Sequence, residues 1–361
     1  KKLLPAAFKR MNDELIRLHY AHNASRTYLG MRLIGIDGST LQLPDSDEIQ
    51  ETFGNCSNNN KGEQDMTMAR TSMAFDLLSD ITLHAIIAPY RTCEREMAYN
   101  HVLNIRSLPD IVDLLIFDRG YPSICLLAFL FEHRKHFLIR CGKWLAQIDK
   151  LLKTNFKDGI IKIYPNKFLR GSDRTLFKTR LPNVPINRAI KLRIVVVKLP
   201  TGESEVLITS LLDQKQYPYS IYKDLYHRRW GSEENYKFYK CRVEIENFSG
   251  TSKCAVEQDF HASVFAGNVR ALLEMEIGQE PEHSSITPLK YGYKINKNIS
   301  LGMLKDSIAE AMWDLQGNLE KFCDDLKWKM RKSQIPIRPG RHFERRRKNR
   351  RKHPQNMRRS H

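Results

Sequence analysis

The first half of the chain alternates between amphipathic stretches that suit helices and short apolar runs that suit strands. Apolar residues recur at helical spacing over residues 3–20, which predicts an N-terminal helix. The run 111–117 is almost continuously apolar, as expected of a strand that is buried on both faces. By the same criteria we expect further strands over 31–36, 66–77, 81–89 and 136–140, helices over 94–105 and 121–133, and an Asn-rich loop over 56–64.

The pattern changes between residues 141 and 205. Residues 160–164 alternate between apolar and polar positions, and 191–199 is followed by 205–211 across a turn at 200–204 that contains proline and glycine. This arrangement predicts a hairpin within a β-rich insertion. Beyond the insertion, helical patterns return, and we expect helices over 219–239, 255–277 and 301–330.

The order of these elements is that of an RNase H-like α/β core. The predicted order along the chain is strands, helix, strand, helix, strand and then, after the insertion, a further helix. In that fold two carboxylates come from adjacent strands and a third from a later helix. We therefore expect a helical N-terminal segment that lacks part of its start (1–30), the first part of the core (31–140), the β-rich insertion (141–205), the rest of the core with C-terminal helices (206–334) and a basic, disordered tail (335–361).

The charged segment 226–240 has the most informative spacing in the chain. On one continuous helix, Tyr226, Arg229, Glu233, Lys237 and Lys240 fall within roughly 80° of one another. A single carboxylate then lies among three cations and a phenol, which suits a metal ligand beside a phosphate backbone. The alternative is a solvated face with ion pairs worth about 0.2–0.5 kcal/mol each.

This spacing resembles the Tyr-x2-Arg-x3-Glu-x6-Lys signature of DDE transposases of the insertion-sequence-four family. In that family the glutamate is the third carboxylate of an Asp-Asp-Glu metal site, and the other three residues contact phosphates at the transposon end. The resemblance implies a metal ligand at Glu233 and DNA contacts at Tyr226, Arg229 and Lys240. Glu234 is the rival carboxylate, but it lies about 100° away from Glu233 on a helix.

Two aspartates at the ends of predicted strands supply the remaining carboxylates. Asp37 lies in Gly-Ile-Asp-Gly-Ser and Asp118 lies in Phe-Asp-Arg-Gly-Tyr, and both phrases resemble acidic motifs of the same family. Taken alone, Asp37 could hydrogen-bond its own turn, and Asp118 could form a surface ion pair. Because both occur in the right order with Glu233, we expect all three to be catalytic metal ligands. The likeness extends over about residues 31–345.

The resemblance also suggests further DNA contacts. Trp230 could pack in the core or form an aromatic wall beside a base displaced from the duplex. Arg140 could reach DNA from the root of the insertion, and Lys237 shares the signature face without being required by it, whereas His227 is expected to be incidental. A nonspecific phosphate clamp, or else a merely solvating tail, is expected from the basic run that contains Arg345, Arg346, Arg347 and Lys348.

The charge of the chain agrees with a polyanionic partner. The formal net charge is +18, from 59 basic and 41 acidic residues, and the excess is concentrated in the tail. Such clustering favours nucleic acid ahead of anionic lipid. The longest strongly apolar run, 124–131, is much shorter than the ~20 residues that span a bilayer. The seven scattered cysteines form no CxxC pair and predict reduced thiols in a cytoplasmic protein.

Together these observations predict a transposase of a bacterial insertion sequence that acts in the cytoplasm at the nucleoid. It is expected to cleave double-stranded DNA at element ends and to transfer the 3′-hydroxyl ends to target DNA. Two Mg²⁺ ions, which Mn²⁺ can replace, and a dimer on paired DNA ends are expected, with no membrane or small-molecule substrate. Two alternatives stay open: a catalytically inactive DNA-binding protein derived from a transposase, and an RNase H-like nuclease without strand transfer.

Overall fold

The structure is a computed structural model of the 361-residue chain. It describes residues 4–22, 25–56, 65–142, 146–154, 156–199, 202–279, 292–313 and 319–338. The chain divides into two compact units. The first comprises 1–21, 41–68 and 237–361, and the second comprises 22–40 and 69–236.

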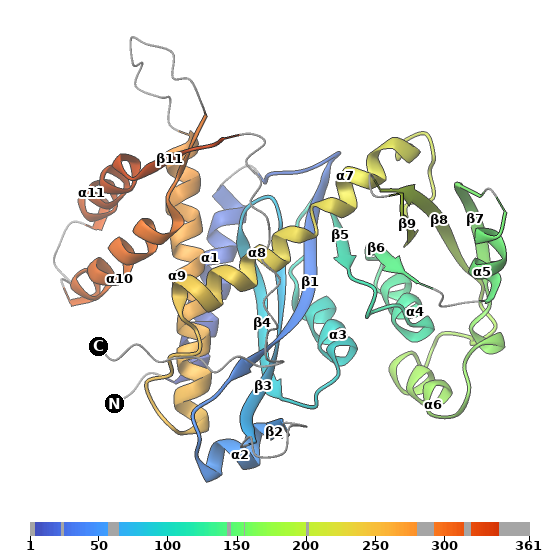
Figure 1. Ribbon diagram of the computed structural model, residues 1–361, viewed down its shortest axis with the longest axis horizontal. Coiled ribbons are helices and arrows are strands. Elements are labelled where there is room, and N and C mark those ends of the chain that lie inside the picture. Colours follow the sequence, from blue (N-terminus) through green and yellow to red (C-terminus); the bar gives the residue numbers. More distant parts are fainter. Residues whose placement is uncertain are drawn as a thin grey trace. The chain divides into compact units, whose positions relative to one another are not determined.

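A mixed sheet of nine strands runs in the order β2-β3-β1-β5-β6-β9-β8-β7, with β4 paired to β3 (Figure 1). Its strands are β1 (Met31–Gln42), β2 (Asn55–Cys56), β3 (Met66–Asp76), β4 (Ile81–Pro89), β5 (Val112–Phe117), β6 (His136–Cys141), β7 (Asp158–Ile163), β8 (Ile190–Lys198) and β9 (Ser204–Thr209). The neighbours β1, β5 and β6 are parallel, whereas β6 to β9, β9 to β8 and β8 to β7 are antiparallel. The predicted α/β class is confirmed.

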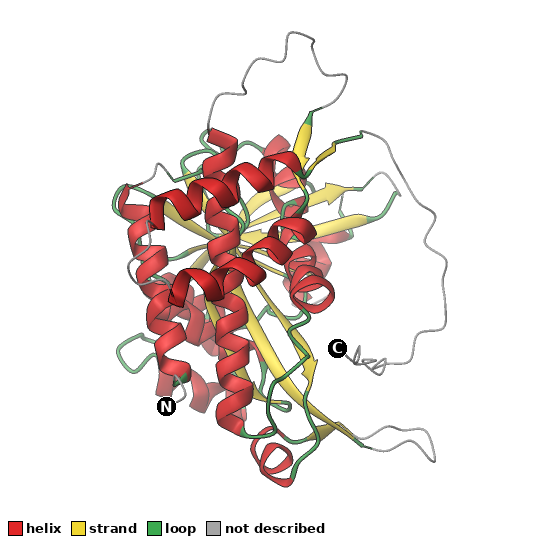
Figure 2. Cartoon of the chain, turned by 90° about the vertical axis from the view of Figure 1, so that its left-hand side faces the viewer, coloured by secondary structure: helices red, strands yellow, loops and turns green. Residues whose placement is uncertain are grey.

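Most of this sheet lies in the second unit; Figure 2 shows the strands in yellow and the helices in red. The helical segments are α3 (Glu94–Asn104), α4 (Ile124–Glu132), α5 (Ala146–Leu152), η1 (Pro165–Lys167), α6 (Gly171–Arg180), η2 (Tyr219–Ile221), α7 (Tyr222–His227) and α8 (Trp230–Phe238), whose last two residues belong to the first unit.

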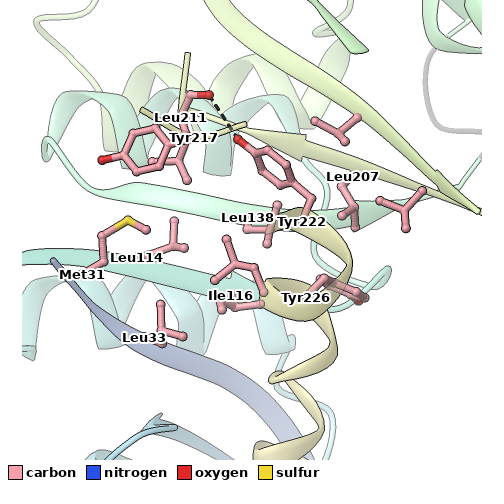
Figure 3. Close-up of a cluster of buried hydrophobic side chains, with 13 residues drawn as sticks. Met31, Leu33, Leu114, Ile116, Leu138, Leu207, Leu211, Tyr217, Tyr222 and Tyr226 are labelled. Carbon is pink, nitrogen blue, oxygen red and sulfur yellow. Dashed lines mark hydrogen bonds between the residues drawn. The ribbon is translucent and has the colours of Figure 1, made fainter. Parts of the chain in front are cut away.

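One face of the sheet packs against α7. Leu33 of β1, Ile116 of β5 and Leu138 of β6 cluster with Tyr222 and Tyr226 of this helix (Figure 3). All five are buried, and burying an aliphatic side chain of this kind contributes roughly 1.5–3 kcal/mol. The packing therefore fixes the start of the predicted catalytic helix against the centre of the sheet.

The opposite face of the sheet packs against α3 and α4. Helix α4 is buried almost all round, and its Phe131 contacts Phe137 of β6 edge to face at 5.6 Å. Tyr99 of α3 meets Phe129 of α4 in the same geometry at 4.8 Å. The apolar character of α4 is thus explained by its position between the sheet and a neighbouring helix.

A buried ion pair sets the register of the two central strands. Arg32 of β1 and Asp113 of β5 are register partners, and their side chains meet at 2.7 Å with almost no exposure to solvent. Lys135 binds the second oxygen of the same carboxylate at 3.0 Å. Because leaving one buried charge unpaired is costly, a slip of these strands is strongly disfavoured.

The first unit is mainly helical. It contains α1 (Pro5–His22), α2 (Asp47–Phe53), the π-helix η3 (Tyr239–Val243), α9 (Lys253–Gln279), α10 (Lys297–Trp313), α11 (Leu319–Lys332) and the short strands β10 (Tyr293–Ile295) and β11 (Gln334–Pro336). Its core joins Leu273 of α9, Leu304 of α10 and Leu326 of α11. A buried bond of 2.6 Å between Asn12 and Asn268 ties α1 to α9.

Most of the predicted elements are confirmed, and four need correction. Strand β1 continues six residues beyond its predicted end at residue 36. The helix predicted over 219–239 is broken at 228–229, and the one predicted over 301–330 forms two helices on either side of residues outside the described part of the chain. The segment 141–205 also contains α5 and α6, and its strands extend the main sheet through β9. Residues 57–64 of the predicted loop lie outside the described residues.

Candidate active site

The parallel register of β1 and β5 brings two aspartates together. The last paired residues are Ile36 and Phe117, so Asp37 and Asp118 are the next residues on adjacent strands. Asp118 follows the end of β5 as predicted, whereas Asp37 lies within β1 and not at its end. Proximity of the two carboxylates therefore follows from strand pairing over six residues on each strand.

A glycine in β1 lets α8 approach this strand closely. A Cβ atom placed on Gly35 would lie 2.1 Å from Oγ of Ser232, a distance that no real contact of this kind shows. Ser232 precedes Glu233 in the chain, and Gly35 lies two residues before Asp37 on the same side of the strand. The absence of a side chain at position 35 thus lets α8 pack closely against β1 two residues before Asp37.

Arg229 bridges two of the predicted ligands. Its Nη2 atom donates to Oε1 of Glu233 at 2.8 Å, and its Nη1 atom lies 3.9 Å from Oδ2 of Asp37. The guanidinium is almost buried, and Glu233 keeps 40% of its side chain exposed. A cation thus already lies between carboxylates from β1 and α8.

A tight turn at 228–229 joins α7 to α8 directly beside this bridge. The backbone N–H groups of Gly231 and Ser232 donate to the carbonyls of Arg228 and Arg229, which lie three residues earlier instead of four. This spacing tightens the chain between α7 and α8. The segment 226–240 is therefore not one continuous α-helix, because it is interrupted at 228–229 and changes to a π-helix at residue 239.

Electrostatics at Asp37 indicates a crowded acidic site. Burial raises the pKa of Asp37 to about 7, and the charges of Asp118 and Glu94 act in the same direction. The backbone N–H of Gly38 and the guanidinium of Arg229 oppose this rise. The ionised carboxylate is therefore costly in the isolated protein, and a bound cation would lower that cost.

Glu94 is a fourth acidic residue that the sequence analysis missed. A Cβ atom on Gly38 would come within 2.6 Å of the Glu94 carboxyl carbon, which shows how closely this side chain packs beside Asp37. Arg70 of β3 binds Glu94 at 2.9 Å. The sequence alone did not single out Glu94, because an acidic residue in the first turn of a helix is commonly explained by its favourable interaction with the helix dipole.

Several tyrosines surround the acidic residues. The hydroxyl groups of Tyr121 and Tyr226 are buried without a hydrogen-bond partner in the structure. Burial raises the pKa of both hydroxyls, and the charge of Asp118 adds to the rise. Tyr236 and Ser72 donate to the backbone carbonyl of Asp37 at 2.9 and 3.0 Å. Two unpaired phenol donors beside carboxylates suit a ligand that carries oxygen atoms.

The remaining predicted DNA contacts are placed as follows. Trp230 is 44% exposed and stacks on His227, which excludes core packing for this side chain. Arg140 forms an ion pair with Glu205 at 3.2 Å across β6 and β9. Lys237 and Lys240 belong to the first unit, where Lys240 lies 3.8 Å from Glu246. The four predicted clamp residues, from Arg345 to Lys348, lie outside the described residues.

The acidic residues suit a hard divalent cation in chemistry, but their side chains are not gathered around one point. No group of three or more His, Cys, Asp and Glu side chains is arranged to hold a metal ion within the described residues. Asp37, Asp118 and Glu233 offer the oxygen ligands that Mg²⁺ prefers. Arg229, which pairs with Glu233 and approaches Asp37, acts as a positively charged substitute between them.

A match to a known protein family covers most of the chain and includes the candidate site. The sequence profile of the transposase DDE domain family matches residues 28–269. This range includes both strand aspartates and all of the helix α8, and it exceeds half of the chain. The protein therefore belongs to the transposase DDE domain family.

Two relatives give further context. The chain is similar to the putative transposase InsZ of Escherichia coli (strain K12), with 29% identity over 167 residues that cover 45% of this chain and 54% of that protein. It thus spans about half the length of this curated relative. Among solved structures it is similar to a piggyBac transposase synaptic complex with hairpin DNA, at 11% identity and a TM-score of 0.44, over 82% of this chain and 56% of the other.

One further property concerns membranes. No helix within the part of the chain that the structure describes is long and apolar enough to cross a bilayer.

Proposed function

We propose that this protein is an insertion-sequence transposase of the insertion-sequence-four family, with an RNase H-like core and an insertion at 141–205. It cuts double-stranded DNA at the ends of a mobile element and joins the 3′-hydroxyl ends to target DNA. The observation that carries the proposal is the position of Asp37 and Asp118 on adjacent parallel strands, with Glu233 held nearby by Arg229. Membership of the transposase DDE domain family supports it.

Asp37, Asp118 and Glu233 are the proposed metal ligands. These carboxylates would hold divalent cations, which would supply activation of the attacking oxygen and stabilisation of the leaving oxygen in an in-line displacement at phosphorus. A cation bound through Oε1 of Glu233 would displace Arg229, because this atom now accepts from that guanidinium at 2.8 Å. The released guanidinium is then able to bind a phosphate of the DNA.

Other residues bind and orient the DNA strand in this proposal. Arg229 and Tyr226 offer N–H and O–H donors from the junction of α7 and α8, and the hydroxyl of Tyr226 has no partner of its own in the structure. Trp230 is exposed and can stack on a displaced base, with a contribution of about 1–3 kcal/mol. Lys240 and the basic tail extend the phosphate contacts, and two subunits act on paired ends.

The test is cleavage of duplex DNA that carries the sequences flanking the coding region, in Mg²⁺ or Mn²⁺. We expect Asp37→Asn, Asp118→Asn and Glu233→Gln to abolish cutting while DNA binding is retained. Glu234→Gln is the matched control because this neighbouring carboxylate is exposed and is not a proposed ligand. Full activity in the three acidic variants would falsify the assignment.

The same assay separates the alternatives. DNA binding without cleavage by the wild-type protein would identify a catalytically inactive, transposase-derived binding protein. Cleavage without joining, tested on a pre-cut end with a free 3′-hydroxyl, would identify a nuclease of the same fold. The ion pair between Glu233 and Arg229 is the observation that makes the first alternative worth testing.

A further inference from the structure

A basic pocket lies in the second unit between strand β8 and the segment that leads into α7. Its volume is about 320 Å³, near the lower end of the range of ligand sites. Lys157, Lys198 and Lys223 contribute to its lining, together with the ring of Tyr219 and with Val196. The pocket therefore combines cationic groups with an apolar wall.

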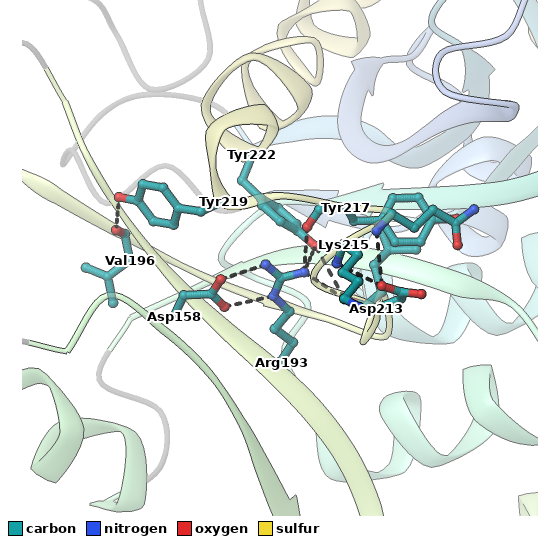
Figure 4. Close-up of polar contacts among 10 residues, drawn as sticks. Asp158, Arg193, Val196, Asp213, Lys215, Tyr217, Tyr219 and Tyr222 are labelled. Atoms are coloured by element: carbon teal, nitrogen blue, oxygen red, sulfur yellow. Dashed lines mark hydrogen bonds and ion pairs between the residues drawn. The ribbon is translucent and has the colours of Figure 1, made fainter.

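The positive charge of the pocket is not neutralised by its own lining. None of the side chains that line it is a carboxylate, and all three lysines are exposed. Asp158 follows Lys157 in the chain, but its two oxygens bind Arg193 at 2.8 and 2.6 Å (Figure 4). The lysines could thus bind an anion without first giving up an ion pair with a carboxylate of the lining.

The walls of the pocket are held in place by a buried arginine. The guanidinium of Arg193 donates to the carbonyl of Tyr217 at 2.7 Å and to the hydroxyl of Tyr222 at 3.2 Å (Figure 4). Tyr219 lies between these two residues, and its own hydroxyl donates to the carbonyl of Val196 at 2.8 Å. The ring of Tyr219 is consequently fixed against β8, while the residue as a whole stays 40% exposed.

We propose that this pocket binds one nucleotide of a DNA strand. The lysines bind the phosphate, and the deoxyribose or base rests against Tyr219 and Val196. The proposal rests on the proposed function, since it assigns a DNA contact away from the cutting site. Lys223 lies three residues before Tyr226 on α7, so the pocket and the phosphate contacts of the catalytic site are carried by the same short segment.

A chemical footprint of the lysines tests the proposal directly. The full-length protein is acetylated with and without a mixed-sequence DNA duplex, and the modified lysines are identified by mass spectrometry. We expect DNA to protect Lys157, Lys198 and Lys223. Lys162 and Lys191, which are exposed register partners on β7 and β8 outside the pocket, are the matched controls and should stay reactive.

A pair of double variants gives a second measurement. The variant Lys198→Ala/Lys223→Ala should bind the duplex roughly 10-fold more weakly at ~0.1 M salt, and its log–log salt slope should fall by about 0.9 for each lost phosphate contact. The control Lys162→Ala/Lys191→Ala should keep the wild-type slope. Because all four side chains are exposed, both variants are expected to fold.

The outcomes separate this inference from the proposed function. If cleavage depends on Asp37 but DNA does not protect the pocket lysines, the pocket proposal alone is overturned. Equal protection of the pocket lysines and the control lysines has the same consequence. Absence of both DNA binding and cleavage overturns both proposals. Protection by a free mononucleotide but not by the duplex also overturns the inference, because the pocket would then be a small-ligand site. Selective protection by the duplex, together with a reduced salt slope, supports it.

Discussion

Replacing Asp37 by asparagine should stabilise the metal-free protein, although it removes a proposed catalytic residue. The pKa of Asp37 is raised to about 7 from its ordinary 3.8, because the side chain is buried and lies near Asp118 and Glu94. The contribution of Asp37 to the free energy of unfolding is fully present below about pH 4, where the side chain is protonated. This contribution is lost as the pH rises through about 7. Asparagine keeps the shape of the side chain and has no charge to bury.

The size of the effect follows from the two pKa values of Asp37. A difference of about three between the folded and unfolded pKa corresponds to about 4 kcal/mol when the group is fully ionised. Only part of this difference is expressed between about pH 5 and about pH 8, and 18% of the side chain is exposed to screening solvent. We therefore expect the advantage of Asp37→Asn to grow by about 2 kcal/mol over that interval.

Urea unfolding in the presence of EDTA measures this advantage at both pH values. Asp173→Asn, which removes an exposed carboxylate of α6, is the matched control and should show no such growth. Addition of Mg²⁺ should stabilise the wild type more than Asp37→Asn, because a ligand of the native state raises its stability by mass action. An equal stability gap at both pH values would refute the reasoning about burial and charge at Asp37.

Three further predictions concern packing and charge. Gly35→Ala should lower the free energy of unfolding by about 1–3 kcal/mol and reduce cleavage. The control Gly302→Ala should not destabilise the protein, because this glycine of α10 has open space around it. Thermal melts and cleavage assays check both variants. Asp113→Ala should cost about 3–5 kcal/mol in urea unfolding, because it removes the carboxylate that balances the buried charge of Arg32. Glu94→Gln should weaken Mn²⁺ binding several-fold in calorimetry, and an unchanged affinity would contradict a role for this charge at the site.

Local patterns in the sequence were sufficient for most helices and strands and for naming the three candidate carboxylates. The run 111–117 is apolar at nearly every position because β5 is buried on both faces, so its limits were visible without a structure. The spacing around Glu233 and the phrases at Asp37 and Asp118 pointed to a transposase, and the family match agrees with that assignment. These features depend on near neighbours in the chain or on residue types alone.

Contacts between distant residues decided the rest. β1 continues past Asp37 because it has β3 as a neighbour in the sheet, a pairing that the sequence pattern around Asp37 does not reveal. The packing of Ser232 on Gly35 and of Glu94 on Gly38 joins segments that are far apart in the sequence. The sequence by itself therefore nominated Asp37, Asp118 and Glu233 as candidate ligands from local motifs, whereas the tertiary structure determined how Glu233 is paired and which further charge lies beside Asp37.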